Sequence, residues 1–167
     1  MTISMYQASA PLFERNLVAL AGILAKAAAW AESRKIQPEV LLNARLSPDM
    51  FPLVRQVQIA CDFAKNTCAR LAGAEPAKIE DNEKNFADLQ ARVARTLELV
   101  RASKAAQIDG SEGRDIRLTV GGQAMEFKGL PYLTGFALPN FFFHYSMTYA
   151  ILRHNGLEIG KRDFIPG

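Results

Sequence analysis

The stretch from Leu130 to Gly156 constrains the fold more than any other part of this sequence. Its inward positions recur at steps of three and four, which is the spacing of one face of an α-helix. Pro139 removes a backbone donor inside the run and predicts a kink there, whereas Gly156 suits the end of the helix. A long helix with such a stripe must bury it against other elements. The stripe consists of Tyr132, Leu133, Phe136, Ala137, Asn140, His144, Met147 and Ile151.

Three earlier stretches have the same helical periodicity and can supply those elements. The first begins after Ser4, a candidate N-cap, and the second ends at Gly73. The third has an apolar stripe on one side and a charged, solvent-facing side on the other. The three stretches cover residues 5–34, 50–72 and 81–102.

Two short alternating runs lie between these stretches and the last helix. Residues 116–120 and 123–127 flank Gly121 and Gly122, a pattern typical of a two-residue β-hairpin. The sequence therefore predicts an all-α fold, a four-helix bundle with a small β-hairpin inserted before the last long helix. No repeat or linker divides the chain, so residues 1–167 are expected to form a single domain.

Composition narrows the class of partner. The chain is 49% hydrophobic and 22% charged, and its net charge of +3 comes from 20 basic and 17 acidic residues that are scattered along it. No basic block is present, which argues against nucleic acid as a partner. No apolar run reaches the ~20 residues that span a bilayer, and the first residues do not resemble a signal peptide, so no membrane partner is expected.

The two cysteines bear on the compartment. Cys61 and Cys68 are seven residues apart on one predicted helix. This spacing separates them by about 10 Å, too far for a disulfide within the chain. We interpret them as reduced core residues, which indicates a cytoplasmic protein.

Polar residues on inward faces mark the place where chemistry could occur. His144 and Asn140 lie one turn apart on the last helix, and Gln58 and Asp62 lie one turn apart on the second. A metal site would use His144 with Asp62 or Gln58 as ligands. A His144–Asp62 pair could alternatively act as a catalytic acid and base. The simplest interpretation is a buried histidine that is hydrogen-bonded to Asp62, Asn140 or a tyrosine.

Four segments of the chain resemble an uncharacterised bacterial family, catalogued as domain of unknown function nineteen ninety-three. The resemblance covers essentially the whole chain. The segments begin at Thr2, at Leu46 (Leu-Ser-Pro-Asp-Met-Phe-Pro), at Phe136 (Phe-Ala-Leu-Pro-Asn-Phe-Phe-Phe-His) and at Ile151 (Ile-Leu-Arg-His-Asn-Gly). That family is similar to the DinB/YfiT-like metalloenzyme superfamily, whose four-helix bundles often bind a divalent metal through three histidines and are often dimers. The superfamily includes thiol-dependent transferases and maleylpyruvate isomerases.

The resemblance also implies which residues would form a site. His144 matches the second histidine of the pattern on the last helix, and Asn140 stands where the first would be. The third ligand falls near Gln58 or Asp62. Two of the three histidines are therefore replaced, so the resemblance supports the bundle but not a standard metal site.

The predicted pocket lies between the second and fourth helices. His144, Asn140, Asp62 and Gln58 would line it, and its aromatic walls would be Tyr6, Trp30 and Tyr145.

Three functions follow as hypotheses. The first is binding of a small molecule around His144 without a tightly held metal and without a cofactor. The second is a transferase or isomerase that uses His144, either metal-free or with zinc, nickel or iron. The third is a structural protein with no chemistry, and a homodimer is expected in each case.

Overall fold

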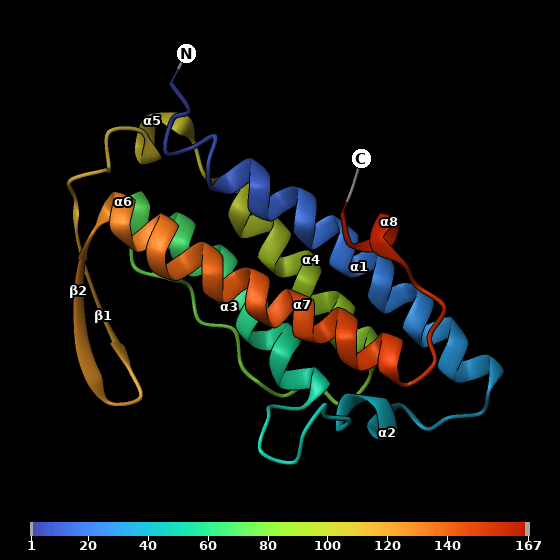
Figure 1. Cartoon of the computed structure of the whole chain (residues 1–167). Helices are drawn as coiled ribbons and strands as arrows, with labels where there is room; N and C mark the ends of the chain where they lie inside the picture. The colour runs from blue at the N-terminus through green and yellow to red at the C-terminus, as the bar shows by residue number, and fades with distance from the viewer. Residues whose placement is uncertain (1, 166–167) are drawn as a thin grey trace.

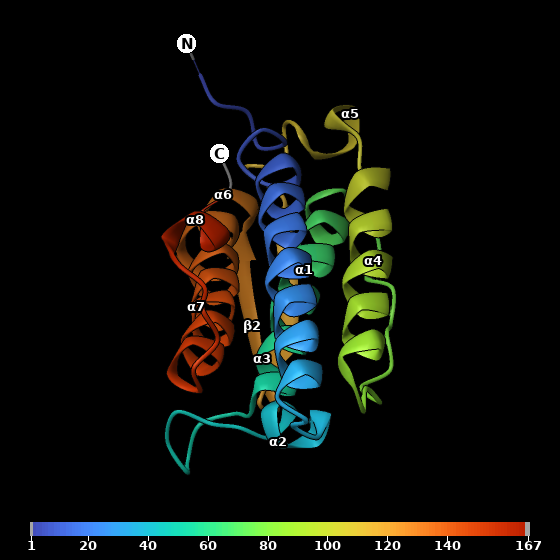
Figure 2. The same cartoon turned by 90° about the vertical axis from the view of Figure 1, so that its right-hand side faces the viewer.

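A computed structural model describes residues 2–165 and shows four long helices lying side by side (Figures 1 and 2). The helix α3 contacts both α7 and α4, and α1 packs mainly against α4. Their buried faces form one continuous apolar core. The long helices are α1 (Ala10–Ser33), α3 (Leu53–Leu71), α4 (Phe86–Ala102) and α7 (Leu138–His154).

This architecture confirms the prediction of a mostly helical fold with a hairpin before the last long helix. Shorter helices accompany the long ones and were only partly expected from the sequence. They are α2 (Pro38–Leu42), α5 (Ala105–Ile108), α6 (Gly129–Tyr132) and α8 (Lys161–Phe164). No helix within residues 2–165 is long and apolar enough to cross a membrane.

Three long helices begin later than the periodicity suggested. The first starts at Ala10 and not after Ser4, because Ser9 donates its hydroxyl to the Met5 carbonyl at 2.7 Å and ends a separate turn. Pro11 then falls in the first turn, where its missing N–H costs nothing. The third of the four starts at Phe86, since the Asn85 side chain caps it by accepting from the Asp88 amide at 2.8 Å.

The expected kink at Pro139 takes the form of a wider helical turn just before it. Residues Leu133–Ala137 (η1) adopt a π-helix and join α6 to α7 in one continuous rod. Pro139 has no N–H to donate to the carbonyl of Gly135, and a wider turn accommodates such a loss of a regular hydrogen bond.

The hairpin has the register that its sequence predicts. Strand β1 (Asp115–Val120) pairs antiparallel with β2 (Gln123–Lys128), and Val120 faces Gln123 across the turn. Gly121 and Gly122 have φ values of +56° and +82°, which only glycine adopts readily. The hairpin projects from one end of the helices, and α2 lies at the other end (Figure 1).

The C-terminal segment folds back onto the helices and is not a free tail. Asp163 pairs with Lys26 of α1 at 2.5 Å. The Phe164 ring stacks on Tyr145 with ring centres 4.1 Å apart, and the Tyr145 hydroxyl donates to the Phe164 carbonyl at 2.8 Å. Leu157 and Ile159 are buried between these contacts.

Candidate functional site

His144 lies between α7 and α3 and has only 8% of its surface exposed. Its Nδ1 is 2.7 Å from the side-chain oxygen of Gln56 on α3. Gln56 is itself buried, and its side-chain nitrogen donates to the Phe51 carbonyl at 3.1 Å. That second bond fixes the orientation of the amide, so the oxygen faces the imidazole. Because an amide oxygen only accepts, Nδ1 carries the hydrogen and Nε2 is left as an acceptor.

Aromatic rings surround the imidazole on two sides. Phe63 of α3 stacks nearly parallel to it, with ring centres 6.2 Å apart and planes 14° apart. Phe143 meets it edge-on at 5.2 Å and an angle of 89°. Phe143 is 51% exposed. The site therefore combines a polar nitrogen with apolar walls, one of which is open to solvent.

The imidazole is uncharged at neutral pH. Burial lowers the pKa of His144 to about 4, and the positive charge of Arg55 acts in the same direction. Within residues 2–165, Nε2 makes no hydrogen bond to the protein. A neutral imidazole with one nitrogen held and the other unused can accept a hydrogen bond from a bound molecule.

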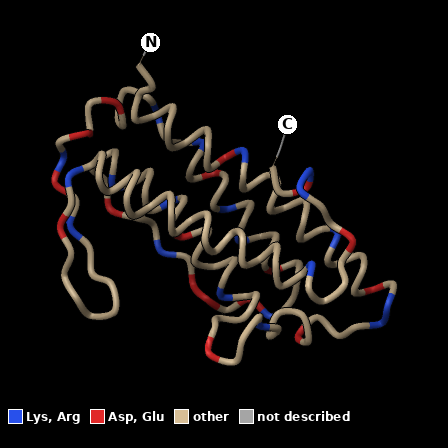
Figure 3. The backbone as a smooth tube through the Cα atoms, viewed as in Figure 1, with Lys and Arg blue, Asp and Glu red and all other residues tan. Residues whose placement is uncertain are grey.

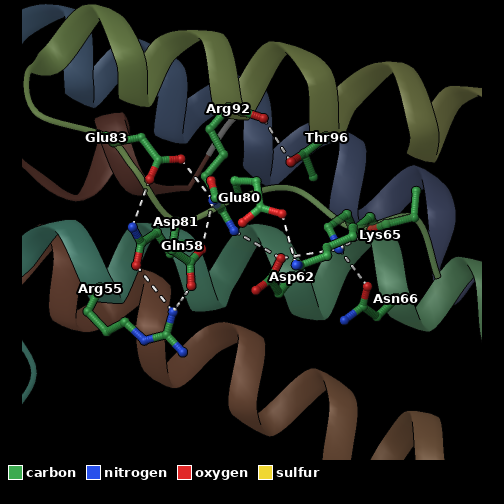
Figure 4. Close-up of polar contacts among 12 residues, drawn as sticks. Arg55, Gln58, Asp62, Lys65, Asn66, Glu80, Asp81, Glu83, Arg92 and Thr96 are labelled. Carbon is green, nitrogen blue, oxygen red and sulfur yellow. Dashed lines mark hydrogen bonds and ion pairs between the residues drawn. The ribbon is translucent and has the colours of Figure 1, made fainter.

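Asp62 and Gln58 belong to a different cluster, which we call the Arg92 network (Figure 4). Asp62 pairs with Arg92 of α4 at 3.1 Å and with Lys65 at 3.2 Å. Gln58 donates to Glu83 at 2.7 Å. The expected hydrogen bond between Asp62 and His144 does not form, because the carboxylate is drawn to two cations and His144 is taken by Gln56.

Arg92 is the centre of this network, and its side chain has no exposed surface. It also pairs with Glu83 at 2.8 Å and Asp81 at 3.0 Å, both from the connection before α4. Burial works against its charge, but the hydrogen bond to Glu83 and the charges of Asp62 and Glu83 outweigh this, so the pKa of Arg92 is raised. Asp81 also pairs with Arg55 at 2.6 Å, which ties the connection to α3.

The other predicted site residues lie in separate places. Asn140 donates its amide to the Phe136 carbonyl of its own helix at 2.8 Å. Tyr145 points to the C-terminal segment, Trp30 lies beside Gly156, and Tyr6 binds Asp109 through its backbone amide at 2.8 Å. Within the described part of the chain, no hydrogen bond joins any of these residues to His144. The predicted single pocket is thus not assembled as expected.

Two buried residues, one in each cluster, had not been singled out from the sequence. Gln56 falls at helical spacing between the buried residues Leu53 and Ala60, and this spacing was the available signal. Arg92 likewise falls on the buried side of α4, between Leu89 and Thr96. A polar residue on an apolar stripe marks a buried contact, although it does not identify the partner.

The side chains present do not fit a three-histidine metal centre. His144 is the one imidazole at the site, and its Nδ1 is already hydrogen-bonded. Asn140 and Gln56 have their amides engaged with carbonyls. Within residues 2–165, no three His, Cys, Asp or Glu side chains gather closely enough to hold a metal ion.

The cysteines do not add a nucleophile. Cys61 and Cys68 are both free and buried in the core, as the sequence predicted. Burial raises the pKa of each thiol to about 12, so the reactive thiolate is scarce at neutral pH.

Comparison with known proteins identifies both the fold of this chain and its family. The crystal structure of a DinB family member protein from Shewanella denitrificans superposes with a TM-score of 0.86. The two sequences are 38% identical, and the match covers 97% of this chain and 93% of that chain. The fold is therefore of the DinB type. Residues 5–165 match the family described as Domain of unknown function (DUF1993), and the chain belongs to this family. A comparison with curated proteins finds no match.

Proposed function

We propose that this protein is a DinB-type four-helix bundle that binds a small organic molecule at His144, between α3 and α7, without a bound metal. One observation carries the proposal. Gln56 holds a neutral imidazole at Nδ1, while Nε2 has no hydrogen-bond partner among residues 2–165. An acceptor that makes no hydrogen bond to the protein, beside an exposed aromatic ring, can accept a hydrogen bond from a bound molecule.

The surroundings indicate the chemistry of the ligand. Phe63 and Phe143 offer ring faces and edges to a flat or apolar body. Nε2 would accept one hydrogen bond from a hydroxyl or N–H group. The positive charge of Arg55 disfavours a cationic ligand at this position. A neutral aromatic alcohol or amide is the class that satisfies all three conditions.

Binding is favoured over acid–base catalysis for a physical reason. With a pKa of about 4, His144 is almost never protonated at neutral pH and cannot serve as a general acid. Its weak proton affinity also makes it a poor general base, because an efficient base has a pKa near the working pH. Asp62, the predicted carboxylate partner, is engaged by Arg92 and Lys65.

The test uses the two histidines of the chain as paired reporters. Protein labelled with ¹⁵N-histidine is titrated with phenol and benzamide, followed by a library of neutral aromatic alcohols and amides. We expect binding to shift the Nε2 signal of His144 and to be lost in His144→Phe. His154→Ala serves as the matched control, because His154 is exposed in the last turn of the same helix.

Two outcomes would contradict the proposal. One is that no compound in the library shifts Nε2 of His144. The other is that compounds bind equally well to His144→Phe, which would place their site elsewhere.

A further inference from the structure

A pocket lies at the C-terminal end of α3, between the end of this helix and the start of β1. It encloses about 400 Å³, and three arginines line it: Arg70, Arg114 and Arg117. Arg70 is in the last turn of α3, and the other two flank the first residues of the hairpin. Basic and acidic residues both occur near the base of the hairpin (Figure 3). Which of these charges are paired therefore decides what the pocket can bind.

Arg114 is held in place by backbone atoms. Its Nη1 donates to the carbonyl of Leu71, the last residue of α3. Gly73 lies directly against the guanidinium, with φ at +74°, and a Cβ there would lie 2.9 Å from Nη1. A side chain at position 73 would therefore be strained, and the end of the Arg114 side chain would have to move to make room for it. The hydrogen bond to the Leu71 carbonyl holds the guanidinium in the pocket wall.

Arg70 is fixed by a side chain. Its Nη1 donates to the Tyr132 hydroxyl at 3.2 Å, and that hydroxyl is also 3.4 Å from the Thr67 hydroxyl. Tyr132 is completely buried, so its oxygen provides a rigid anchor. A guanidinium has five N–H donors, and these contacts use one donor from Arg70 and one from Arg114.

The charged side chains of the pocket differ in whether they form ion pairs. Asp115 pairs with Lys128 at 2.6 Å, and Arg117 pairs with Glu126 at 2.9 Å. Within residues 2–165, neither Arg70 nor Arg114 has a carboxylate within 4 Å. Glu75 is the remaining acidic side chain of the lining, so Arg70 and Arg114 outnumber it.

We propose that the pocket containing Arg70 and Arg114, the Arg70–Arg114 pocket, binds the phosphate group of a small molecule. Two guanidiniums with fixed positions and spare donors can grip a phosphate with parallel hydrogen bonds. Arg114 has a structural role, because it donates one hydrogen bond to the Leu71 carbonyl at the end of α3. This role explains the position of Arg114 alone. It does not account for a second fixed guanidinium in the same pocket. The pocket shares no residue with the His144 site, so the two proposals stand independently.

Calorimetric titration with inorganic phosphate and with phenyl phosphate tests this proposal, using sodium chloride of matched ionic strength as the reference. We expect saturable binding in the millimolar range or tighter. Arg70→Gln should lower the affinity for phosphate about tenfold, because one of the two guanidiniums that bind the phosphate is removed. Arg117→Gln is the matched control within the pocket, since Arg117 is already paired, and it should change the affinity less than about twofold.

Arg114→Lys keeps the charge and removes the planar fork, so it should weaken phosphate binding while the protein stays folded. If this variant fails to fold, the phosphate affinity of Arg70→Gln still tests the proposal, because Arg70 donates to the Tyr132 hydroxyl and not to the carbonyl at the end of α3. The absence of saturable binding of both phosphates to the wild-type protein would overturn the proposal. Wild-type affinity in Arg70→Gln, or equal losses in Arg70→Gln and Arg117→Gln, would also overturn it.

Discussion

The helix α3 contributes to two polar clusters that differ in charge and in the number of ion pairs they contain. Towards α4, Asp62 and Gln58 join the Arg92 network, in which one cation meets three carboxylates. Towards α7, Gln56 makes a single neutral hydrogen bond to His144. The first cluster links two helices and a long connection, whereas the second leaves an imidazole nitrogen available. Residues of similar type on one helix therefore form a charged network in one direction and a neutral hydrogen bond in the other.

The difference explains why His144 and Asp62, one of the pairs considered from the sequence, are not hydrogen-bonded to each other in the structure. A carboxylate pairs preferentially with nearby cations, and the Asp62 carboxylate lies within 3.2 Å of both Arg92 and Lys65. A histidine that is far from any carboxylate and buried becomes neutral and accepts an amide as its partner. The attraction between opposite charges therefore places Asp62 in the Arg92 network and leaves His144 with a neutral partner.

The largest expected effect comes from breaking the charged cluster. Arg92→Ala leaves the buried Glu83 carboxylate without its cation and should lower the free energy of unfolding by about 3–5 kcal/mol. Arg95→Ala is the matched control, because Arg95 lies on the same helix and its pair with Glu98 is exposed. The control should cost no more than about 1 kcal/mol in urea denaturation. Similar losses in the two variants would contradict the assignment of a stabilising role to the network.

The neutral cluster should give the protein a distinctive dependence on pH. The pKa of His144 is about 4 when folded, below the value of about 6.5 expected for the unfolded chain. Between these values the unfolded state binds more protons, so stability rises with pH up to about 6.5 and falls as the pH drops towards 4. The contribution reaches at most about 3 kcal/mol.

This contribution is measured by urea denaturation at a series of pH values, in the wild type and in His144→Phe. The difference between the two proteins isolates His144, because the other groups titrate in both. Parallel curves between pH 4 and 6.5 would contradict the account.

A smaller effect is expected from the hydrogen bond within the neutral cluster. Gln56→Leu removes the acceptor of the Nδ1 hydrogen and should destabilise the fold by about 1–3 kcal/mol, since a buried donor is left unpaired. A double-mutant cycle with His144→Phe separates this bond from the other contacts of Gln56, which include the Phe51 carbonyl. A coupling energy near zero would mean that the two side chains do not interact.

The smallest expected effect is that of added metal. Zinc chloride should not raise the melting temperature of the wild type more than that of His144→Phe, because the donor set around His144 lacks further ligands. Metal content after dialysis provides the second readout. About one zinc per chain that disappears in His144→Phe would contradict the assignment and revive the metalloenzyme hypothesis.

Periodicity predicted the helices and the hairpin well because these depend on local spacing. The apolar stripes, the glycine pair of the hairpin and the glycine that ends the last helix are all patterns of residues that lie close together in the sequence. Helix starts were less accurate, since Ser9 ends a separate turn and Asn85 caps α4 at positions that also resembled the inside of a helix. The sequence located His144 as an inward residue and did so correctly.

The partners of His144 could not be found in the same way. Gln56, Gln58 and Asp62 lie within two turns of α3, and only their angles around the helix decide which faces α7 and which faces α4. The connection before α4 also contributes Asp81 and Glu83 to the network, and its path over α3 has no local sequence signal. Contacts between distant segments therefore required the structure.

The protonation state of His144 tests the central claim most directly. Nitrogen NMR of the imidazole is recorded from pH 8 to pH 4 on ¹⁵N-histidine-labelled protein, and His144→Phe identifies the signals. The account predicts a neutral ring with the hydrogen on Nδ1 and no titration until the pH approaches 4. Titration close to pH 6.5, or a hydrogen on Nε2, would contradict it, because His144 would then be neither held by Gln56 nor available as an acceptor.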